Sequence, residues 1–155
     1  MAKSAEAYMD IIMRIKQDNS TFDDIVRLIE SLRGPGGCPW DRQQTRHSLK
    51  RQFLEECYEL LEAIERDDQE AIVEEMGDVL LHMAFQFQIA AESDEFSQQD
   101  VFIALRNKIV RRHPHVFGDS EVGNAMDVEV KWEAIKREER PDNKRSILDG
   151  APKNM

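Results

Sequence analysis

Apolar residues recur along this chain at the spacing of α-helices, and no stretch alternates apolar and polar positions long enough to indicate a strand. Six helices are predicted, over about residues 4–16, 22–32, 48–66, 70–92, 97–112 and 128–140. Thr21 and Asp24 have the spacing of a capping pair for the second helix, and Pro114 stops the fifth. The pattern predicts an all-α fold class, a helical bundle of about five to six helices.

The two longest predicted helices, 48–66 and 70–92, form the centre of this bundle. Only the polar residues 67–69 separate them, and such a short turn favours an antiparallel pair. The helix over 70–92 is apolar on nearly all sides, which is typical of a central, buried helix. The Gly- and Pro-rich segment 34–41 breaks the helical pattern before the pair, and we expect a loop there.

Length and composition indicate one main domain. A chain of 155 residues can bury a sizeable core in a single unit. We expect an N-terminal helix within residues 1–20, the main domain over residues 21–140, and a flexible polar tail over residues 141–155.

The charge balance narrows the class of partners. Acidic side chains outnumber basic ones 31 to 21, and a net charge of -10 would repel the phosphates of a nucleic acid. No apolar run reaches the roughly 18 residues of a membrane span, and residues 1–10 lack a signal pattern. Two cysteines make no disulfide framework and suit a reducing compartment. We therefore expect a soluble, cytoplasmic protein that binds neither nucleic acid nor a membrane.

Asp78 is the most informative residue on the predicted central pair. On a helical wheel it falls between Phe85 and Ile89, and an ionised carboxylate among apolar residues is costly unless a positive charge meets it. Glu75 lies three residues earlier, and the preceding helix carries Glu56 and Glu59 at the same spacing. An antiparallel pair would bring the four carboxylates together, where a divalent cation would relieve their repulsion. Oxygen ligands suit Mg²⁺ or Mn²⁺ better than zinc.

Two other interpretations of these acids stay open at this point. A buried salt bridge to Arg or Lys would also neutralise Asp78, and evenly spaced glutamates are common on solvated helix faces. A di-iron or di-manganese carboxylate site usually needs a Glu-x-x-His step on two helices. Here the third positions after Glu56 and Glu75 are Glu59 and Asp78, and only His82, four residues beyond Asp78, offers an imidazole.

These residues also match a known family. The pattern Glu55-Glu56-x-x-Glu59 followed by Glu75-x-x-Asp78 resembles the metal-binding signature of MazG-type nucleoside triphosphate pyrophosphohydrolases. The surrounding segments strengthen the likeness: Gly37-Cys38-Pro39-Trp40-Asp41, Arg111-Arg112-His113-Pro114-His115-Val116-Phe117 and Lys131-Trp132-Glu133-x-Ile135-Lys136. The resemblance spans about residues 22–149. Many relatives carry two such modules in tandem, whereas this chain carries one.

The resemblance implies Mg²⁺-dependent hydrolysis of a nucleoside triphosphate to the monophosphate and pyrophosphate. It also implies an all-α homodimer, with helices of two subunits packed around each site. By motif match the metal ligands are Glu56, Glu59, Glu75 and Asp78. Glu55, Glu56 and Glu59 are the catalytic candidates, and spacing does not decide which carboxylate is the general base. The alternative is a non-catalytic helical module that binds a nucleotide or a protein partner.

A triphosphate also needs cationic side chains, and several residues are candidates for substrate binding. Lys108, Arg111 and Arg112 share one helix face, although a solvated basic helix end would look the same. The substrate-binding candidates are Lys108, Arg112, Trp132, Lys136, Trp40 and Lys50. Either tryptophan has a structural alternative, as a core or loop-packing residue. The chain has no GxxxxGK[ST] segment, which excludes a P-loop mechanism.

Overall fold

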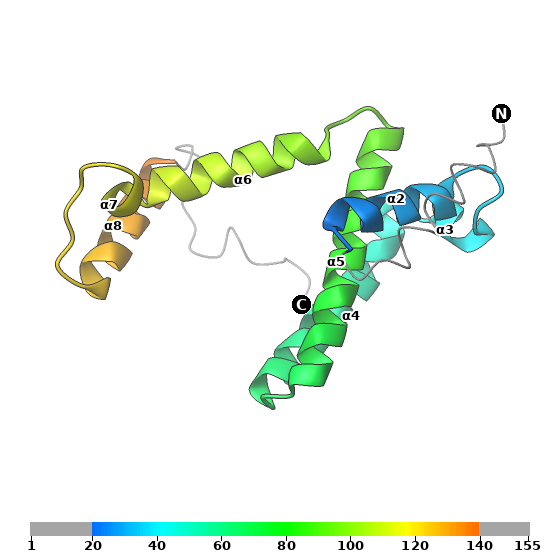
Figure 1. Ribbon diagram of the computed structural model, residues 1–155, viewed down its shortest axis with the longest axis horizontal. Coiled ribbons are helices and arrows are strands. Elements are labelled where there is room, and N and C mark those ends of the chain that lie inside the picture. Colours follow the sequence, from blue (N-terminus) through cyan, green and yellow to red (C-terminus); the bar gives the residue numbers. More distant parts are fainter. Residues whose placement is uncertain (1–19, 140–155) are drawn as a thin grey trace. The chain divides into compact units, whose positions relative to one another are not determined.

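The structure is a computed structural model that describes residues 20–139 (Figure 1). The described residues form seven helices and no strand, so the predicted all-α class is confirmed. The helices are α2 (Phe22–Arg33), α3 (Pro39–Gln43), α4 (Arg46–Glu65), α5 (Gln69–Glu92), α6 (Gln98–Arg112), α7 (Pro114–Phe117) and α8 (Ala125–Glu138). The predicted helix over 4–16 and the predicted tail over 141–155 lie outside the described residues.

Two short helices were not predicted, so the described helices exceed the predicted five to six: α3 begins inside the expected loop 34–41, and α7 lies between the predicted helices 97–112 and 128–140. Both begin with a proline, Pro39 and Pro114. The first helical position needs no backbone N–H donor, and proline's fixed φ suits it. Pro114 therefore follows the end of α6 as predicted but also starts the next helix.

Local capping sets where the helices begin. The predicted pair at α2 is confirmed, because Thr21 Oγ1 accepts from Asp24 N at 3.3 Å and Asp24 Oδ2 accepts from Thr21 N at 3.0 Å. The same capping box forms between Thr45 and Ser48, so α4 begins at Arg46, before the predicted Ser48. Asn124 likewise caps α8 and starts it at Ala125, before the predicted residue 128.

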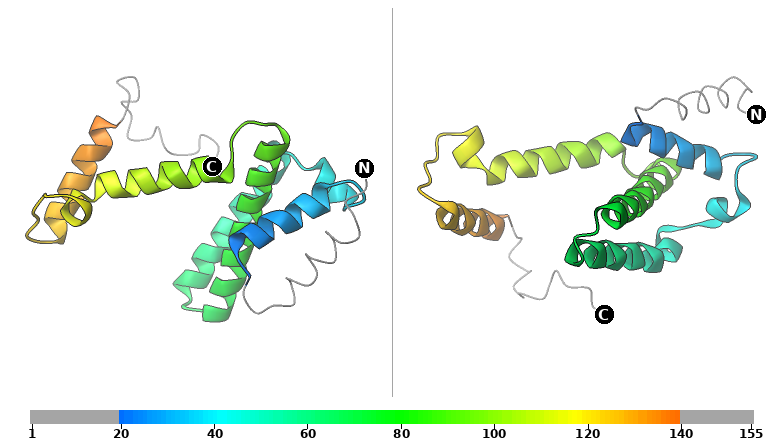
Figure 2. Two further views of the ribbon diagram at one scale, coloured as in Figure 1. Left: turned by 45° about the horizontal axis from the view of Figure 1, so that its top comes forward. Right: turned by 60° about the horizontal axis from the view of Figure 1, so that its bottom comes forward.

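The chain divides into two compact units, Met1–Gln98 and Gln99–Met155. In the first unit, α4 and α5 lie side by side and run in opposite directions, and α2 crosses α5 (Figure 2). A core cluster of Ile29, Leu49, Ala84 and Phe85 joins the three helices. The hydrophobic contacts of α2 with α5 thus involve the second half of α5.

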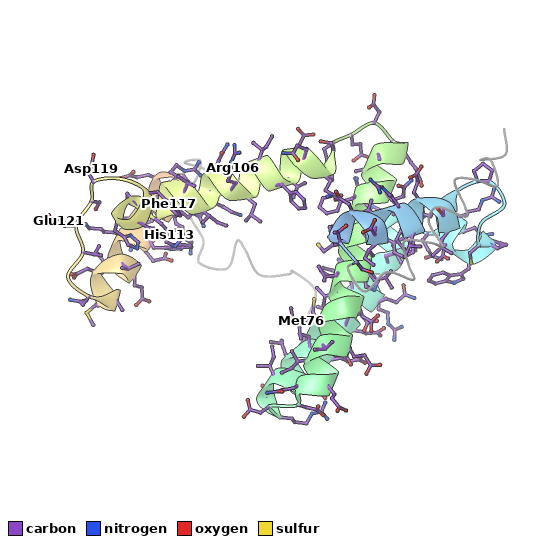
Figure 3. The ribbon with its side chains drawn as sticks, viewed as in Figure 1. Met76, Arg106, His113, Phe117, Asp119 and Glu121 are labelled. Atoms are coloured by element: carbon purple, nitrogen blue, oxygen red, sulfur yellow. The ribbon has the colours of Figure 1, made fainter. Side chains whose placement is uncertain are left out.

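The first half of α5 is not buried, contrary to the prediction for this helix. Val73 is 75% exposed and Met76 is 51% exposed (Figure 3), whereas His82, Ala84, Phe85 and Ala90 are buried further along α5. The sequence shows that α5 is apolar on nearly all sides. The sequence does not show that, within the described residues, only the second half of α5 holds buried side chains.

The second unit holds α6, α7 and α8, and none of these helices has a fully buried side chain. Phe102, Leu105, Arg106, Ile109, Val110 and Phe117 line an open hollow of about 470 Å³ on α6 and α7. No described helix is both long enough and apolar enough to cross a membrane.

Candidate metal centre

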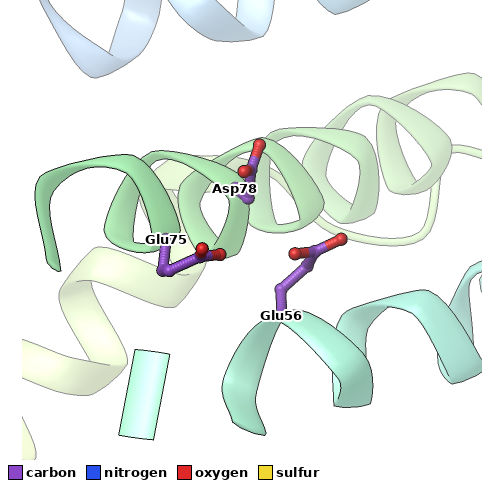
Figure 4. Close-up of side chains that lie close together, drawn as sticks. All are labelled: Glu56, Glu75 and Asp78. Atoms are coloured by element: carbon purple, nitrogen blue, oxygen red, sulfur yellow. The ribbon is translucent and has the colours of Figure 1, made fainter. Parts of the chain in front are cut away.

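Three carboxylates converge where α4 faces α5. Glu56 projects from α4, and Glu75 and Asp78 project from α5 on the facing side (Figure 4). One oxygen from each of these carboxylates lies within 4.8 Å of the others. We call Glu56, Glu75 and Asp78 the acidic cluster. All three side chains are half-buried.

The register of the helix pair explains this convergence. The turn between α4 and α5 centres on Asp67, which adopts a left-handed φ of 52°. Glu56 and Asp78 each lie eleven residues from Asp67 along the chain, and Glu59 and Glu75 each lie eight residues from it. In an antiparallel pair, residues equidistant from the turn lie opposite each other.

The electrostatics of the acidic cluster reflect crowding of like charges. Burial raises the pKa of Glu56 above its ordinary value, and the charges of Asp78, Glu59 and Glu75 raise it further. Burial also raises the pKa of Glu75, followed by the charges of Glu59 and Asp78. Both shifts disfavour the ionised form, so the ionised cluster is costly as it stands.

Nearby cations do not offset the crowding of the acidic cluster: the charge of Arg66 lowers the pKa of Glu75, but this pKa stays above its ordinary value. Within residues 20–139, no lysine or arginine forms an ion pair with Glu56, Glu75 or Asp78. The salt-bridge interpretation of Asp78 therefore has no support in the described chain. Three oxygen donors without a cationic partner form a donor set that fits a hard divalent cation.

The other two acids of the motif lie differently. Glu59 is exposed and is not one of the three converging carboxylates, although it is close enough to raise the pKa values of Glu56 and Glu75. Glu55 is also exposed, and its Oε1 accepts from Arg51 Nε at 2.8 Å. The structure thus brings three of the four predicted ligands together, with Glu59 adjacent and Glu55 directed to Arg51.

His82, which the sequence offered only as the imidazole of a di-iron or di-manganese alternative, lies beside this site. It follows Asp78 by one helical turn, is 7% exposed, and packs its ring 5.6 Å from that of Phe53. Its Nδ1 has no hydrogen-bond partner among the described residues. Burial lowers the pKa of His82, and Asp78 partly offsets this effect. Its only sequence signal was the four-residue spacing from Asp78.

The substrate-binding candidates are divided between the two units. Trp40 on α3 is 53% exposed, and Lys50 on α4 is exposed. In the second unit, the guanidinium of Arg112 lies over the ring of Trp132, with its Cζ 5.5 Å from the ring centroid. Lys136 pairs with Glu133 at 2.7 Å, and Lys108 is exposed on α6.

Comparison with known proteins shows that part of this acidic helical chain is similar to a described domain family. Residues 44–117 match the family model described as the MazG nucleotide pyrophosphohydrolase domain. The matched segment contains the whole acidic cluster together with Glu55, Glu59, Lys108 and Arg112. Trp40, Trp132 and Lys136 lie outside the matched segment.

Individual relatives are similar to nearly the whole chain. YabN of Bacillus subtilis, an uncharacterized protein, is 48% identical over 88% of this chain and 27% of its own length. The nucleoside triphosphate pyrophosphohydrolase/pyrophosphatase MazG of Thermotoga maritima is 46% identical over 86% of this chain and 51% of its own. The nucleoside triphosphate pyrophosphohydrolase of Escherichia coli K12 is 41% identical over the same shares. The chain thus spans about half the length of these two enzymes and about a quarter of YabN.

Proposed function

We propose that this chain hydrolyses nucleoside triphosphates to the nucleoside monophosphate and pyrophosphate, with Mg²⁺ as the metal and Mn²⁺ as a substitute. One observation carries the proposal: three carboxylates converge without a cationic partner inside a segment that matches the MazG family model. The names of the Thermotoga and Escherichia relatives support the substrate class.

Glu56, Glu75 and Asp78 would hold the metal, and Glu59 is a further carboxylate whose charge raises the pKa values of Glu56 and Glu75. A bound Mg²⁺ would neutralise the negative charge on the phosphate oxygens and lower the pKa of a water molecule. A carboxylate that is not committed to the metal can take a proton from the attacking water. Of the two exposed candidates, Glu59 suits this role better than Glu55, because Arg51 already engages the Glu55 carboxylate.

The remaining candidates would bind the nucleotide. Arg112 and Trp132 are the best supported, because they contact each other and combine a cation with an aromatic face. We assign Lys108 and Lys136 to the phosphates with them. Trp40 and Lys50 are kept as candidates because both side chains are exposed on the first unit.

The proposed active form is a homodimer. Large apolar side chains on α4 and α5 are exposed in the described single chain, including Tyr58, Leu61, Val73, Met76 and Leu80. Apolar surface gathered on neighbouring helices commonly marks an interface. A second copy of the chain would cover this surface next to the acidic cluster.

The test is a panel of ribo- and deoxyribonucleoside triphosphates with Mg²⁺, scored for pyrophosphate separately from orthophosphate. We expect pyrophosphate as the product. Asp78→Ala and Glu59→Ala should abolish turnover with helical content retained, and Glu62→Gln, an exposed charge change on α4, should not. Metal binding without pyrophosphate release from any member of the panel would favour the alternative, a non-catalytic module. Normal turnover by Asp78→Ala would contradict the site assignment.

A further inference from the structure

A second charged group lies in the second unit, where the ends of α6 and α8 meet. Glu139, which follows α8, receives hydrogen bonds from two consecutive arginines of α6. Arg111 Nε donates to Glu139 Oε1 at 2.6 Å. Arg112 donates to Oε2 through Nε at 3.0 Å and through Nη2 at 2.5 Å. The single carboxylate therefore orients both guanidinium groups.

The contacts around Arg112 leave it little freedom. Its side chain is 18% exposed and that of Glu139 is 20% exposed. The guanidinium of Arg112 contacts both the Glu139 carboxylate and the ring of Trp132, and the ring of His113 meets that of Trp132 edge-on, with their centroids 4.7 Å apart. The two arginines lower the pKa of Glu139 to about 2, so the carboxylate is ionised across the physiological range.

The way in which Glu139 holds the arginines leaves donors unused. Arg111 is engaged through Nε, and Arg112 through Nε and Nη2. The Nη1 groups of both arginines have no acceptor within the described chain. Two arginines and one glutamate together carry a net charge of +1. Guanidinium groups that a carboxylate orients and that keep unused donors suit a phosphate, which binds arginine with directional hydrogen bonds.

We propose that Glu139 is a positioning residue, which fixes Arg112 against Trp132 and holds Arg111 beside it so that their remaining N–H groups bind a phosphate of the nucleotide. The inference rests on the proposed function for the identity of the ligand. It adds a residue outside the MazG match at 44–117 and outside the substrate-binding candidates found in the sequence.

Two simpler roles predict different results for Glu139→Gln. If Glu139 only joined the ends of α6 and α8, its loss would lower stability and leave KM unchanged. If it only reduced the positive charge, its neutralisation would raise the net charge to +2 and lower KM. If Glu139 positions the arginines, Glu139→Gln should instead raise KM, because the gain in positive charge does not replace the lost orientation of the guanidinium groups.

The experiment compares Glu139→Gln with Glu139→Asp and with Glu138→Gln, which removes the same charge from the neighbouring exposed residue. We expect Glu139→Gln to raise the KM for nucleotide about tenfold, as loss of oriented charge-assisted hydrogen bonds implies, with kcat changed less than about twofold. Glu139→Asp, which keeps the charge, should have a KM between those of Glu139→Gln and the parent. Glu138→Gln should have the KM of the parent. An unchanged or lower KM for Glu139→Gln overturns the proposal, whatever its Tm.

A binding measurement separates this inference from the proposed activity. One of the two tryptophans of the chain, Trp132, lies next to Arg112, so the intrinsic fluorescence of the chain reports on ligand binding there. Inorganic tripolyphosphate should change this fluorescence, and Glu139→Gln should raise its Kd about tenfold. If no triphosphate is hydrolysed but this loss of binding is seen, the positioning role stands and the proposed activity fails. If triphosphates are hydrolysed and the Kd does not rise, only the positioning role fails.

Discussion

Replacing Asp78 by asparagine removes one charge from the acidic cluster and keeps the size of the side chain. Oxygens of Glu56 and Asp78 lie within 4.8 Å of each other. At this distance two unit charges repel by about 1 kcal/mol in water and about 3.5 kcal/mol at an effective dielectric of 20. Because both side chains are half-exposed, the lower figure applies. We expect metal-free Asp78→Asn to be more stable than the parent by about 1 kcal/mol, which raises Tm by about 2–4 °C.

The sign of the pH dependence follows from the raised pKa values of Glu56 and Glu75, whose ordinary value is 4.5. As pH rises from about 4.5 past the raised pKa values, the folded state binds more protons than the unfolded state. The free energy of unfolding of the metal-free protein therefore falls over this range. Asp78 is the largest charge contribution to the shift of Glu56, and Asp78→Asn should therefore flatten this dependence. Below pH 4.5 the acids are protonated and the advantage of the variant should disappear.

The assay is thermal unfolding with EDTA or with Mg²⁺ between pH 4 and pH 8. At a Mg²⁺ concentration one hundred times Kd, the parent should gain about 2.7 kcal/mol, or about 8 °C, near neutral pH. Asp78→Asn should lose most of this gain, whereas Glu62→Gln should keep it. A metal-free Asp78→Asn variant that is less stable than the parent at pH 7, or that keeps the full response to Mg²⁺, would contradict the role given to Asp78.

Three further predictions concern the scaffold that holds the acidic cluster. Arg33 is 6% exposed, pairs with Glu92 and donates to the backbone carbonyls of Asp41 and Gln44. Arg33→Met should therefore lower the free energy of unfolding, measured in urea, by about 3 kcal/mol. A loss below about 1 kcal/mol would contradict this prediction. Gly77→Ala adds a Cβ that meets nothing within 4 Å and should stabilise α5 by about 1 kcal/mol. Gly37→Ala, in contrast, would place a Cβ 2.2 Å from Leu32 O and should lower Tm. A lower Tm for Gly77→Ala would mean that another surface packs on this face of α5.

The sequence predicted the helices where local chemistry decides the structure. The capping pair of Thr21 and Asp24, the short turn before α5 and the end of α6 before Pro114 all follow from neighbouring residues. The same rules misplaced the start of α4, because Thr45 rather than Ser48 is the capping residue. They also treated Pro39 as a helix breaker, although proline can equally start a helix.

The candidate site was predictable to the extent that it lies on one helix pair. The spacing of Glu56, Glu75 and Asp78 around a short turn was enough to predict that these acids meet. The spacing could not show that Glu59 stays exposed beside the cluster or that Glu55 turns to Arg51, because rotation about each helix axis depends on packing.

By itself, the sequence determined the helical class, the antiparallel central pair and the acids that this pair presents, because these depend on periodicity and short turns. Only the tertiary structure decided which part of α5 is buried, that His82 packs beside Phe53, and that Glu139 meets Arg112. The last of these pairs is 27 residues apart in the chain. Contacts of this kind depend on how whole helices pack, and no local pattern of residues encodes them.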